Sequence, residues 1–325
     1  MSKYQRGPDR DELLADVAEM YYGEDLTQAE ISRQIGMTRS AVSRMLTEAR
    51  QKEIVEIIVH RPLRFDSELE SALIERFKLQ NGRVLLWPQK HGQYDRLRFR
   101  LGRVAAQVLR GLLRPEMVLG VAWGTTVSAT IEALEVPEPV PMHVVQLVGV
   151  LGSSSHAFNA QALVEMLASK VGGEATYLYS PFIVENAVTA QSILNIPNVR
   201  DAISLGRKCD VALLGIGTVT DANYCSLYLG GHISRGVVKN LVDAGAVGDV
   251  SGRHFDQYGN EANIDFHDRL VGIARDDLLA IPTRLGVAGD VAKAQAILGA
   301  LRGGYVNMLV TDSNTAEKLL LLDGE

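Results

Sequence analysis

From residue 83 onward, the sequence alternates between short apolar runs and segments with helical periodicity. VLGVAW (118 to 123) and VVQLVGVL (144 to 151) are each followed by a helical pattern, and further apolar runs are ATYLYS (175 to 180), VALLGIG (211 to 217), LVGIA (270 to 274), LLAIPTRL (278 to 285) and VNMLVT (306 to 311). Strands that are apolar along their whole length are buried on both faces, as in a parallel sheet covered by helices. This region therefore predicts an α/β domain with a doubly wound, mostly parallel sheet.

The N-terminal part of the chain shows a different pattern, with three helical segments separated by short breaks. Residues 11 to 22 (DELLADVAEMYY) are amphipathic at helical spacing. Thr27 and Glu30 match a capping box at the start of a second helix. Gly36 can supply the positive φ of a sharp turn, and Thr38 can cap a third helix. This spacing of two helices around a short turn predicts a helix-turn-helix.

The segment after the third helix predicts a short strand, because EIVEIIVH (53 to 60) is β-branched and bounded by charge. A strand at this place indicates a winged-type helix-turn-helix. The chain has 325 residues, more than a typical single domain of about 100 to 200. We therefore expect a helix-turn-helix domain over residues 1 to 60, a junction helix within 61 to 82, and the α/β domain over 83 to 325.

The formal net charge of the chain is −6, which is the wrong sign for a partner made of phosphates. The charge is unevenly spread, however. Residues 9 to 30 carry eight acids against Arg10, whereas residues 33 to 52 carry five basic residues against Glu48, a local balance of five minus one, or +4. Local positive charge is sufficient for phosphate contacts, because charges interact over about 10 Å at moderate salt. The second segment therefore suits a surface that faces DNA.

The third helix carries small polar residues with arginines between them, opposite an apolar face. This composition is typical of a recognition helix, whose N-terminal end enters the major groove. A glutamine near the start of the preceding helix suits a phosphate contact. We expect double-stranded DNA to be contacted by Gln28, Thr38, Arg39, Ser40, Ser43, Arg44 and Thr47. The alternative is an ordinary helical hairpin with a charged, solvated face.

Several classes of protein are not indicated. The longest apolar runs fall far short of the roughly 20 residues that a membrane-spanning helix needs, and the N-terminus has no apolar signal core. We therefore expect a cytoplasmic protein with no membrane partner. The two cysteines, Cys209 and Cys225, form no CxxC pattern, and no histidine pair has a metal-ligand spacing. Neither a metal nor a cofactor is expected.

In open parallel sheets, ligands bind at the carboxyl ends of the strands, where loops lead into helix N-termini. GVAWGTT ends an apolar strand at Gly124 and opens a helix with Thr125 and Thr126. The amides of that helix start and the two hydroxyls would form a cradle for an anion. The segment lacks the lysine of a P-loop, so binding of a nucleoside triphosphate is not indicated.

Two further segments and a lysine belong to the same predicted edge. LLGIGTVTD contains Gly215 and Gly217, which allow a small ligand to approach the backbone, although a plain strand-ending turn has the same pattern. GAVGDVSGRHFDQYGN offers Asp249 for sugar hydroxyls and Arg253 for a phosphate or carboxylate, the alternative being a glycine-rich loop with a surface ion pair. Lys293 begins the next helix and would add a cation, unless it is only a solvated helix lysine.

Together these motifs resemble the SorC family of sugar-responsive bacterial transcriptional regulators. The resemblance rests on the helix-turn-helix, GVAWGTT, GAVGDVSGRHFDQYGN, IPTRLGVAG, AILGALRGGYVNMLVTD and the closing TAEKLLLL, in that order over nearly the whole chain. It implies an effector domain similar to the fold of sugar-phosphate isomerases and glucosamine-phosphate deaminases. It also implies assembly into dimers or tetramers on DNA, and a sugar, polyol or sugar phosphate that alters operator affinity.

Residue by residue, the resemblance places the ligand loops of the family at Gly124, Thr125, Thr126, Asp249 and Lys293. Thr125 and Lys293 are similar to the positions that contact phosphate in members that bind phosphosugars. This chain departs from the family pattern in two places. The motif GVAGG reads GVAGD, which puts Asp290 near the anion site, and the loop GVLGSSSH lacks an arginine. Both departures weigh against a doubly phosphorylated ligand and leave an unphosphorylated polyol or pentose open.

We therefore predict a DNA-binding transcriptional regulator, a homodimer or homotetramer, whose operator affinity is controlled by a sugar, polyol or sugar phosphate. The predicted effector-binding residues are Gly124, Thr125, Thr126, Gly215, Gly217, Asp249, Arg253 and Lys293. One alternative is a sugar-phosphate isomerase or deaminase with a DNA-binding appendage. Such chemistry needs a positioned acid or base beside a carbonyl, and Asp221, Asp249, Asp265 and His232 form no compact pattern of this kind. Another alternative is constitutive DNA binding, with the α/β domain serving only oligomerisation.

Overall fold

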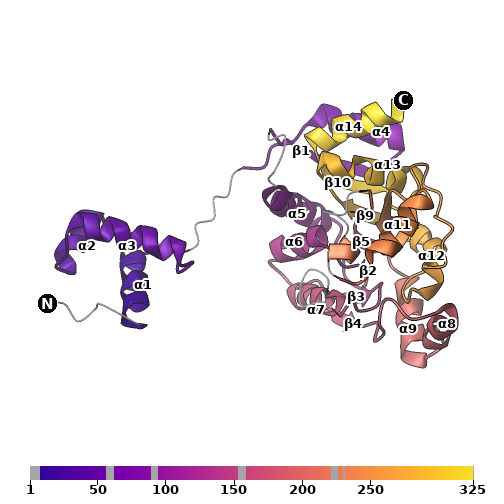
Figure 1. Cartoon of the computed structure of the whole chain (residues 1–325), viewed down its shortest axis with the longest axis horizontal. Helices are drawn as coiled ribbons and strands as arrows, with labels where there is room; N and C mark the ends of the chain where they lie inside the picture. The colour runs from indigo at the N-terminus through magenta and orange to yellow at the C-terminus, as the bar shows by residue number, and fades with distance from the viewer. Residues whose placement is uncertain are drawn as a thin grey trace. The chain divides into compact units, whose positions relative to one another are not determined.

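The computed structural model describes residues 8 to 55, 62 to 88, 94 to 152, 159 to 220, 226 to 229 and 231 to 324. The chain divides into two compact units, Met1–Pro62 and Leu63–Glu325 (Figure 1). Each unit has an apolar core of its own.

The first unit contains three helices, α1 (Pro8–Tyr22), α2 (Gln28–Gln34) and α3 (Arg39–Gln51). The predicted capping box of α2 is confirmed, because the Thr27 hydroxyl accepts a hydrogen bond from the Glu30 amide and the Glu30 carboxylate accepts one from the Thr27 amide. Gly36 has a φ of 67°, as the turn between α2 and α3 requires. The three helices close on a core of Leu13, Leu14, Val17, Ala18, Ile31, Val42, Met45, Leu46 and Ala49.

The strand expected over residues 53 to 60 is not present in its first three residues, and residues 56 to 60 lie outside the described part of the chain. Glu53 has a φ of 59°, which ends α3 and turns the backbone. The amides of Ile54 and Val55 then donate to the Ala49 carbonyl, so both side chains pack against the helix core. Ile54 and Val55, two of the residues that favoured a strand here, serve instead to close the end of α3.

The second unit begins with α4 (Ser67–Phe77), β1 (Asn81–Leu85), α5 (Tyr94–Arg110), β2 (Val118–Val121), α6 (Thr125–Ala133), β3 (His143–Gln146), α7 (Ala160–Val171) and β4 (Glu174–Thr176). It continues with α8 (Ala187–Leu194), α9 (Pro197–Gly206), β5 (Val211–Gly215), β6 (Gly217–Thr218), α10 (Ser226–Leu229), α11 (Arg235–Asp243), β7 (Gly248–Val250) and β8 (Arg253–Phe255). The last elements are η2 (His267–Arg269), α12 (Arg275–Ala280), β9 (Thr283–Val287), η3 (Val291–Lys293), α13 (Ala294–Arg302), β10 (Met308–Asp312) and α14 (Ser313–Gly324).

The main sheet has seven strands in the order β1-β10-β9-β5-β2-β3-β4, and all neighbouring pairs are parallel. From β2 the chain proceeds through β3 to β4 at one edge, whereas from β5 it proceeds through β9 and β10 in the opposite direction. Helices α5, α6 and α7 cover one face of the sheet, and α9 and α14 cover the other (Figure 1). The predicted doubly wound parallel fold is therefore confirmed. Its strand order reverses between β2 and β5, the place where ligands bind in such sheets.

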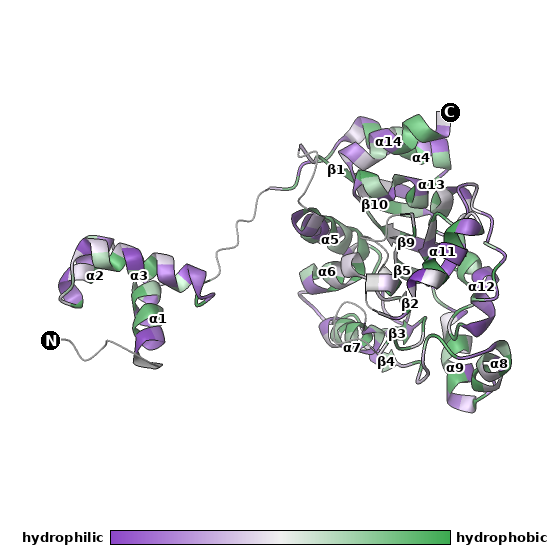
Figure 2. Cartoon of the chain, in the orientation of Figure 1, coloured by the Kyte–Doolittle hydropathy of each residue, from purple (hydrophilic) through white to green (hydrophobic). Residues whose placement is uncertain are grey.

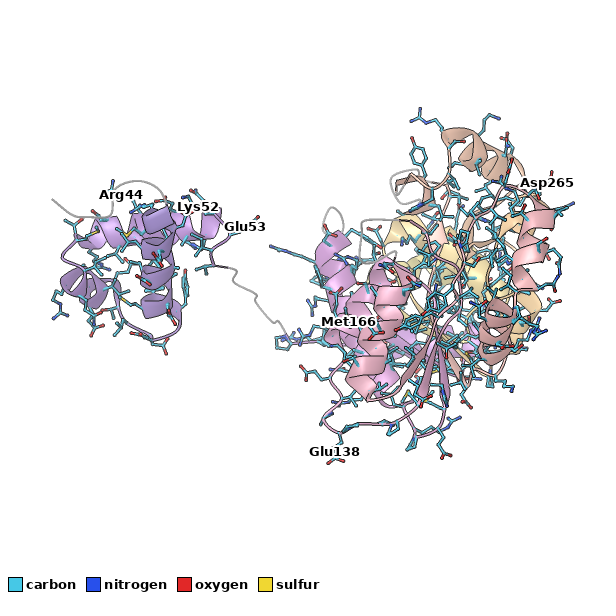
Figure 3. All side chains as sticks on the ribbon, turned by 90° about the horizontal axis from the view of Figure 1, so that it is seen from below. Arg44, Lys52, Glu53, Glu138, Met166 and Asp265 are labelled. Carbon is cyan, nitrogen blue, oxygen red and sulfur yellow. The ribbon has the colours of Figure 1, made fainter. Side chains whose placement is uncertain are left out.

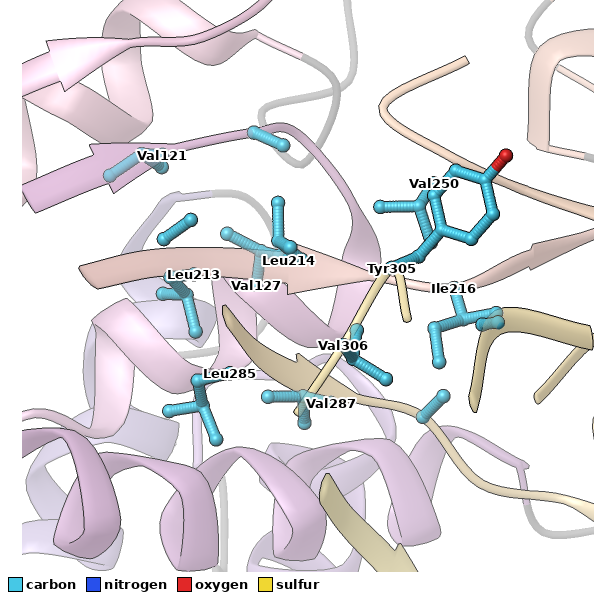
Figure 4. Close-up of a cluster of buried hydrophobic side chains, with 14 of the residues drawn as sticks. Val121, Val127, Leu213, Leu214, Ile216, Val250, Leu285, Val287, Tyr305 and Val306 are labelled. Carbon is cyan, nitrogen blue, oxygen red and sulfur yellow. The ribbon is translucent and has the colours of Figure 1, made fainter. Parts of the chain in front are cut away.

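Apolar side chains from adjacent strands form the centre of the second unit. Figure 2 shows the hydrophobic stretches of the strands and the alternation of apolar and polar residues along the covering helices. In Figure 4, Leu213 and Leu214 of β5 lie beside Val121 of β2 and Leu285 of β9, and all four are fully buried. Burial of one such side chain contributes about 1.5 to 3 kcal/mol. The packed side chains of these strands therefore hold the strand ends in fixed positions relative to one another.

Helices α5 and α6 approach each other closely at Gly102. A Cβ atom at this position would lie 2.6 Å from the backbone carbonyl group of Ala129 on α6. Only glycine therefore permits this separation between the two helices. The close packing brings the N-terminal turn of α5 beside that of α6.

The glycine-rich segment 245 to 260 does not have the alternative form of a simple loop, because its β7 and β8 form an antiparallel hairpin that pairs with β6. The expectations for three other segments of the second unit are wrong. LLAIPTRL divides at Pro282 into the end of α12 and the strand β9, since proline cannot continue the helix. LVGIA forms only isolated bridges, through Leu270 and Gly272, and the strand expected over 175 to 180 ends at Thr176.

Within the described residues, no helix has the length and apolar character required to span a membrane.

Cys209 is a buried free thiol, whereas Cys225 lies outside the described residues. Desolvation raises the pKa of the Cys209 thiol to about 12, so this thiol stays protonated at neutral pH.

Candidate functional site

Except for Gln28, the residues predicted to contact DNA lie on one exposed face of α3 and at its N-cap. Thr38, Arg39, Ser40, Ser43, Arg44 and Thr47 are all exposed, and Gln28 is partly exposed at the start of α2. The opposite face of α3 is buried in the core of the first unit. Figure 3 shows Arg44 projecting outward from this helix. The side chains are thus arranged as a recognition helix requires.

Two ion pairs between α1 and the end of α3 neutralise part of the charge of the first unit. Arg10 of α1 contacts Glu48 at 2.6 Å, and Lys52 contacts Asp11 of α1 at 2.5 Å. Arg10 lowers the pKa of the Glu48 carboxyl, and Asp11 raises the pKa of the Lys52 ammonium. Arg33, Arg39, Arg44 and Arg50 form no ion pair with other residues in the described part of this unit. The positive charge therefore lies on arginines, outside the contact between α1 and α3.

The second candidate site lies where the strand order reverses. Gly124, which follows β2, is the N-cap of α6, with a φ of 150° and no side-chain hydrogen bond to the helix. The next residue, Thr125, opens the helix. The first amides of a helix have no partner within the helix, and they attract anions. Of the predicted cradle of Gly124, Thr125 and Thr126, the first two residues stand at this helix start, and anion binding there stays a prediction.

Lys293, at the end of η3, is only 6% exposed. Its ammonium donates to the Tyr94 hydroxyl at 3.0 Å and to the Ile216 carbonyl, beyond the end of β5, at 3.3 Å. Among the described residues, no carboxylate oxygen lies within the 4.0 Å of an ion pair with it. A buried cation without an anionic partner is unfavourable, so this arrangement suits a ligand that brings a negative charge.

Tyr94 joins this site from α5, although no sequence motif indicates it. Its hydroxyl lies 3.0 Å from the Lys293 ammonium and 3.5 Å from the Thr125 hydroxyl. One turn further along α5, Arg98 donates to the Thr125 carbonyl at 3.4 Å. The helix itself was detectable, because its apolar residues Leu97, Leu101, Val104, Ala105 and Leu109 follow helical spacing. The contacts of Tyr94 had no local signal, since its partners lie far away in the sequence.

Asp249 of β7 faces Gly217 of β6, its partner in the small antiparallel sheet. A Cβ atom at Gly217 would lie 2.1 Å from the Asp249 carboxylate, so the absence of a side chain makes room for this group. The Gly252 amide donates to the carboxylate at 3.0 Å. Burial raises the pKa of Asp249 to about 6, against the opposing effects of the Gly252 amide and the Lys293 ammonium.

The other predicted effector residues have contacts within the fold. The Thr126 hydroxyl donates to the Val287 carbonyl of β9 at 2.7 Å, which ties α6 to the sheet. Gly215 lies at the end of β5, where a Cβ atom would meet this same Thr126 hydroxyl at 3.6 Å. Arg253 contacts Glu261 at 3.9 Å and donates to the His267 carbonyl at 3.5 Å. Arg253 opposes Val250 on the hairpin, so its side chain and that of Asp249 leave opposite faces.

Asp290 adopts a φ of 85° and caps the short helix η3. Its carboxylate accepts from the Ala292 amide at 3.0 Å, and its own amide donates to the Asp312 carboxylate at 3.0 Å. The negative charge expected near the anion site is therefore engaged in the turn that presents Lys293. Of the segment GVLGSSSH, residues 153 to 156 lie outside the described part of the chain.

Both units match known protein families and solved structures. The family described as "Putative sugar-binding domain" matches residues 61–321, and the family described as Sigma-70, region 4, matches residues 12–52. The transcriptional regulator LsrR of Escherichia coli (strain K12) is 33% identical over 322 residues, which are 97% of this chain and 96% of the relative. LsrR of Enterobacter sp. (strain 638) is 32% identical over 315 residues, covering 97% of this chain and 94% of the relative. The full-length sorbitol operon regulator SorC from Klebsiella pneumoniae has a TM-score of 0.71 and 26% identity, covering 96% of this chain and 99% of that chain.

These matches extend over the helix-turn-helix, the parallel sheet and the strand-end site together. They support a regulator over the enzyme alternative, because the relatives are transcriptional regulators along nearly their whole length. The chain therefore belongs to the SorC family of transcriptional regulators, which join an N-terminal helix-turn-helix to a sugar-binding domain.

Proposed function

We propose that this regulator binds a sugar phosphate at the carboxyl ends of β2, β5 and β9, and that the bound ligand alters its affinity for an operator. The phosphate would bind at the N-terminus of α6, between Thr125 and Lys293. The sugar hydroxyls would bind the Asp249 carboxylate, since a carboxylate accepts strong hydrogen bonds from them. The buried ammonium of Lys293 favours a phosphorylated ligand over the unphosphorylated polyol or pentose that the sequence left open.

One observation carries this proposal, which is the buried ammonium of Lys293 without a carboxylate partner among the described residues. A phosphate beside it would gain both a charge interaction and the amides at the start of α6. A neutral sugar would gain neither. The proposal thus specifies the phosphate as the part of the ligand that contributes most to affinity.

A thermal-shift screen of sugars, polyols and their monophosphates tests this proposal. A ligand at about 100 times its dissociation constant should stabilise the protein by about 2.7 kcal/mol. Lys293→Met should remove the response to phosphorylated compounds. Lys239→Met is the matched control, because Lys239 is an exposed lysine on α11 with 73% of its side chain accessible. If only unphosphorylated compounds stabilise the protein, or if Lys293→Met responds as the unchanged protein does, the phosphate assignment is wrong.

We propose further that the exposed face of α3 contacts the operator, and that the regulator binds DNA as a homodimer or homotetramer. A modest charge on each subunit supports binding by more than one copy, since affinity rises with the number of phosphates contacted. In this proposal residues 1 to 60 bind DNA and residues 83 to 325 bind the ligand. A variant lacking residues 1 to 60 should show no operator shift in a gel but should keep its thermal response to the ligand. Retention of operator binding by this variant would refute the assignment.

We infer that the strand-end site binds its ligand without converting it. Isomerases and deaminases of sugar phosphates need an acid or base that moves a proton beside the carbonyl. Asp249 is the acid whose charge interacts with Lys293, and its carboxylate is held by the Gly252 amide, while Asp290 caps η3. Incubation of the protein with the stabilising sugar phosphate, followed by NMR, should show an unchanged ligand. Formation of an isomer or release of ammonia would contradict the inference.

A further inference from the structure

Tyr94 is the residue at the candidate effector site that neither the sequence motifs nor the proposed function accounts for. It opens α5 and lies 31 residues before Thr125 and 199 residues before Lys293, yet it contacts both. Its aromatic ring also lies below the Lys293 ammonium, at 5.2 Å from the ring centroid. Three elements therefore meet at this point, namely α5, α6 and η3.

The direction of the hydrogen bonds follows from the chemistry of the groups. An ammonium can only donate, so the Tyr94 oxygen accepts from Lys293. The Tyr94 and Thr125 hydroxyls lie 3.5 Å apart, at the outer limit of a hydrogen bond, and either of them can be the donor. A phosphate oxygen at the start of α6 would be a stronger acceptor for the phenol hydrogen of Tyr94, because it is charged.

The position of Tyr94 is fixed by packing that does not depend on a ligand. Gly102 allows α5 to lie against α6, and Arg98 holds the first residue of α6 through the Thr125 carbonyl. The Tyr94 hydroxyl therefore already stands beside both groups that would hold a phosphate. A preorganised donor loses little entropy when the ligand binds.

We propose that Tyr94 is a specificity-determining residue of the effector site, whose hydroxyl donates to the phosphate of the ligand while it accepts from Lys293. This inference rests on the proposed function, since it requires a phosphorylated ligand at the start of α6. The ammonium lowers the pKa of the phenol against the opposing effect of burial, and a more acidic phenol is a better donor. Tyr94 would thus favour a phosphate ester over the corresponding free sugar.

Inorganic phosphate is the probe that tests this role, because it carries the phosphate group alone. The apparent dissociation constant is measured for the full chain from the dependence of Tm on phosphate concentration, in chloride buffer at constant ionic strength. Tyr94→Phe removes the hydroxyl and keeps the ring. It should weaken phosphate binding about tenfold or more, as expected for loss of a hydrogen bond to a charged group. Tyr258→Phe is the control, because Tyr258 is 64% exposed.

A second readout separates this role from a structural one. The stabilisation by a free sugar that binds the protein should be the same in Tyr94→Phe and the unchanged protein, and so should Tm without ligand. The assignment of Tyr94 is overturned if Tyr94→Phe lowers the affinity for phosphate by less than tenfold. It is also overturned if the variant lowers the affinity for the free sugar as much as that for phosphate. If Lys293→Met weakens phosphate binding while Tyr94→Phe does not, only this inference fails. If the unchanged protein binds neither phosphate nor any phosphorylated sugar, the proposed function fails as well.

Discussion

Replacement of Asp249 by Asn should stabilise the unliganded protein at neutral and alkaline pH while it weakens sugar binding. The carboxyl is partly buried against Gly217, and its pKa is raised from the usual 3.8 to about 6. The folded protein therefore holds this proton more tightly than the unfolded chain does. The stability that this proton contributes is present below about pH 4, and it is lost as pH rises to about 6 and beyond.

The difference between the two pKa values corresponds to about 3 kcal/mol, which is an upper limit because Asp249 as a whole is only partly buried. Asparagine keeps the shape of the side chain and has no proton to lose. We therefore expect Asp249→Asn to be more stable than the unchanged protein by about 1 to 3 kcal/mol near pH 8, and to differ little near pH 4. For a domain of this size the gain would raise Tm by about 2 to 6 °C.

The assay is thermal unfolding of both proteins without ligand, followed by circular dichroism at several pH values from about 4 to 8. Asp201→Asn is the control, since the Asp201 side chain is 73% exposed, and it should show no pH-dependent gain. The affinity for the stabilising sugar phosphate should fall about tenfold or more in Asp249→Asn, because a charge-assisted hydrogen bond is lost. A difference in Tm that does not change with pH, or a variant that is less stable near pH 8, would refute this account of Asp249.

Three further predictions concern other parts of the chain. Arg44→Ala should weaken operator binding by about 1 to 3 kcal/mol in a gel shift. Arg10→Ala, which removes an ion pair within the first unit, should have little effect on operator binding. An equal loss of operator affinity in both variants would contradict the α3 assignment. Thr27→Ala removes one side of the capping box and should cost about 1 kcal/mol, measured as faster amide hydrogen exchange in α2, and unchanged exchange would argue against this role. Gly217→Ala should leave Tm nearly unchanged but displace the Asp249 carboxylate and weaken sugar binding, so a normal affinity would show that the carboxylate does not contact the ligand.

Local signals were sufficient to predict much of this fold. The capping box at Thr27, the turn at Gly36 and the helix start at Gly124 each depend on residues a few positions apart. The parallel sheet followed from apolar runs, because a strand that is buried on both faces shows this in its own sequence. In these cases the physical cause and the pattern lie in the same short segment.

The rest of the site depends on contacts between distant segments, and no short pattern encodes them. Tyr94 reaches Lys293 only because Gly102 lets α5 pack against α6. The hairpin that carries Asp249 had no clear signal, since its glycines are common to loops and to tight hairpin turns. Asp290 looked like a charge opposed to phosphate binding, and only the backbone geometry shows that it caps η3.

The fit between Gly217 and Asp249 also limits the order in which the two positions can change during evolution. A side chain at position 217 would occupy the space of the carboxylate as long as the aspartate is present. A larger residue at position 217 is therefore tolerated only after the side chain at position 249 has been replaced by a smaller one or points in another direction. Lineages that abandon this ligand should lose the aspartate first and the glycine later, and a sequence with Asp249 and a large residue at 217 should be rare.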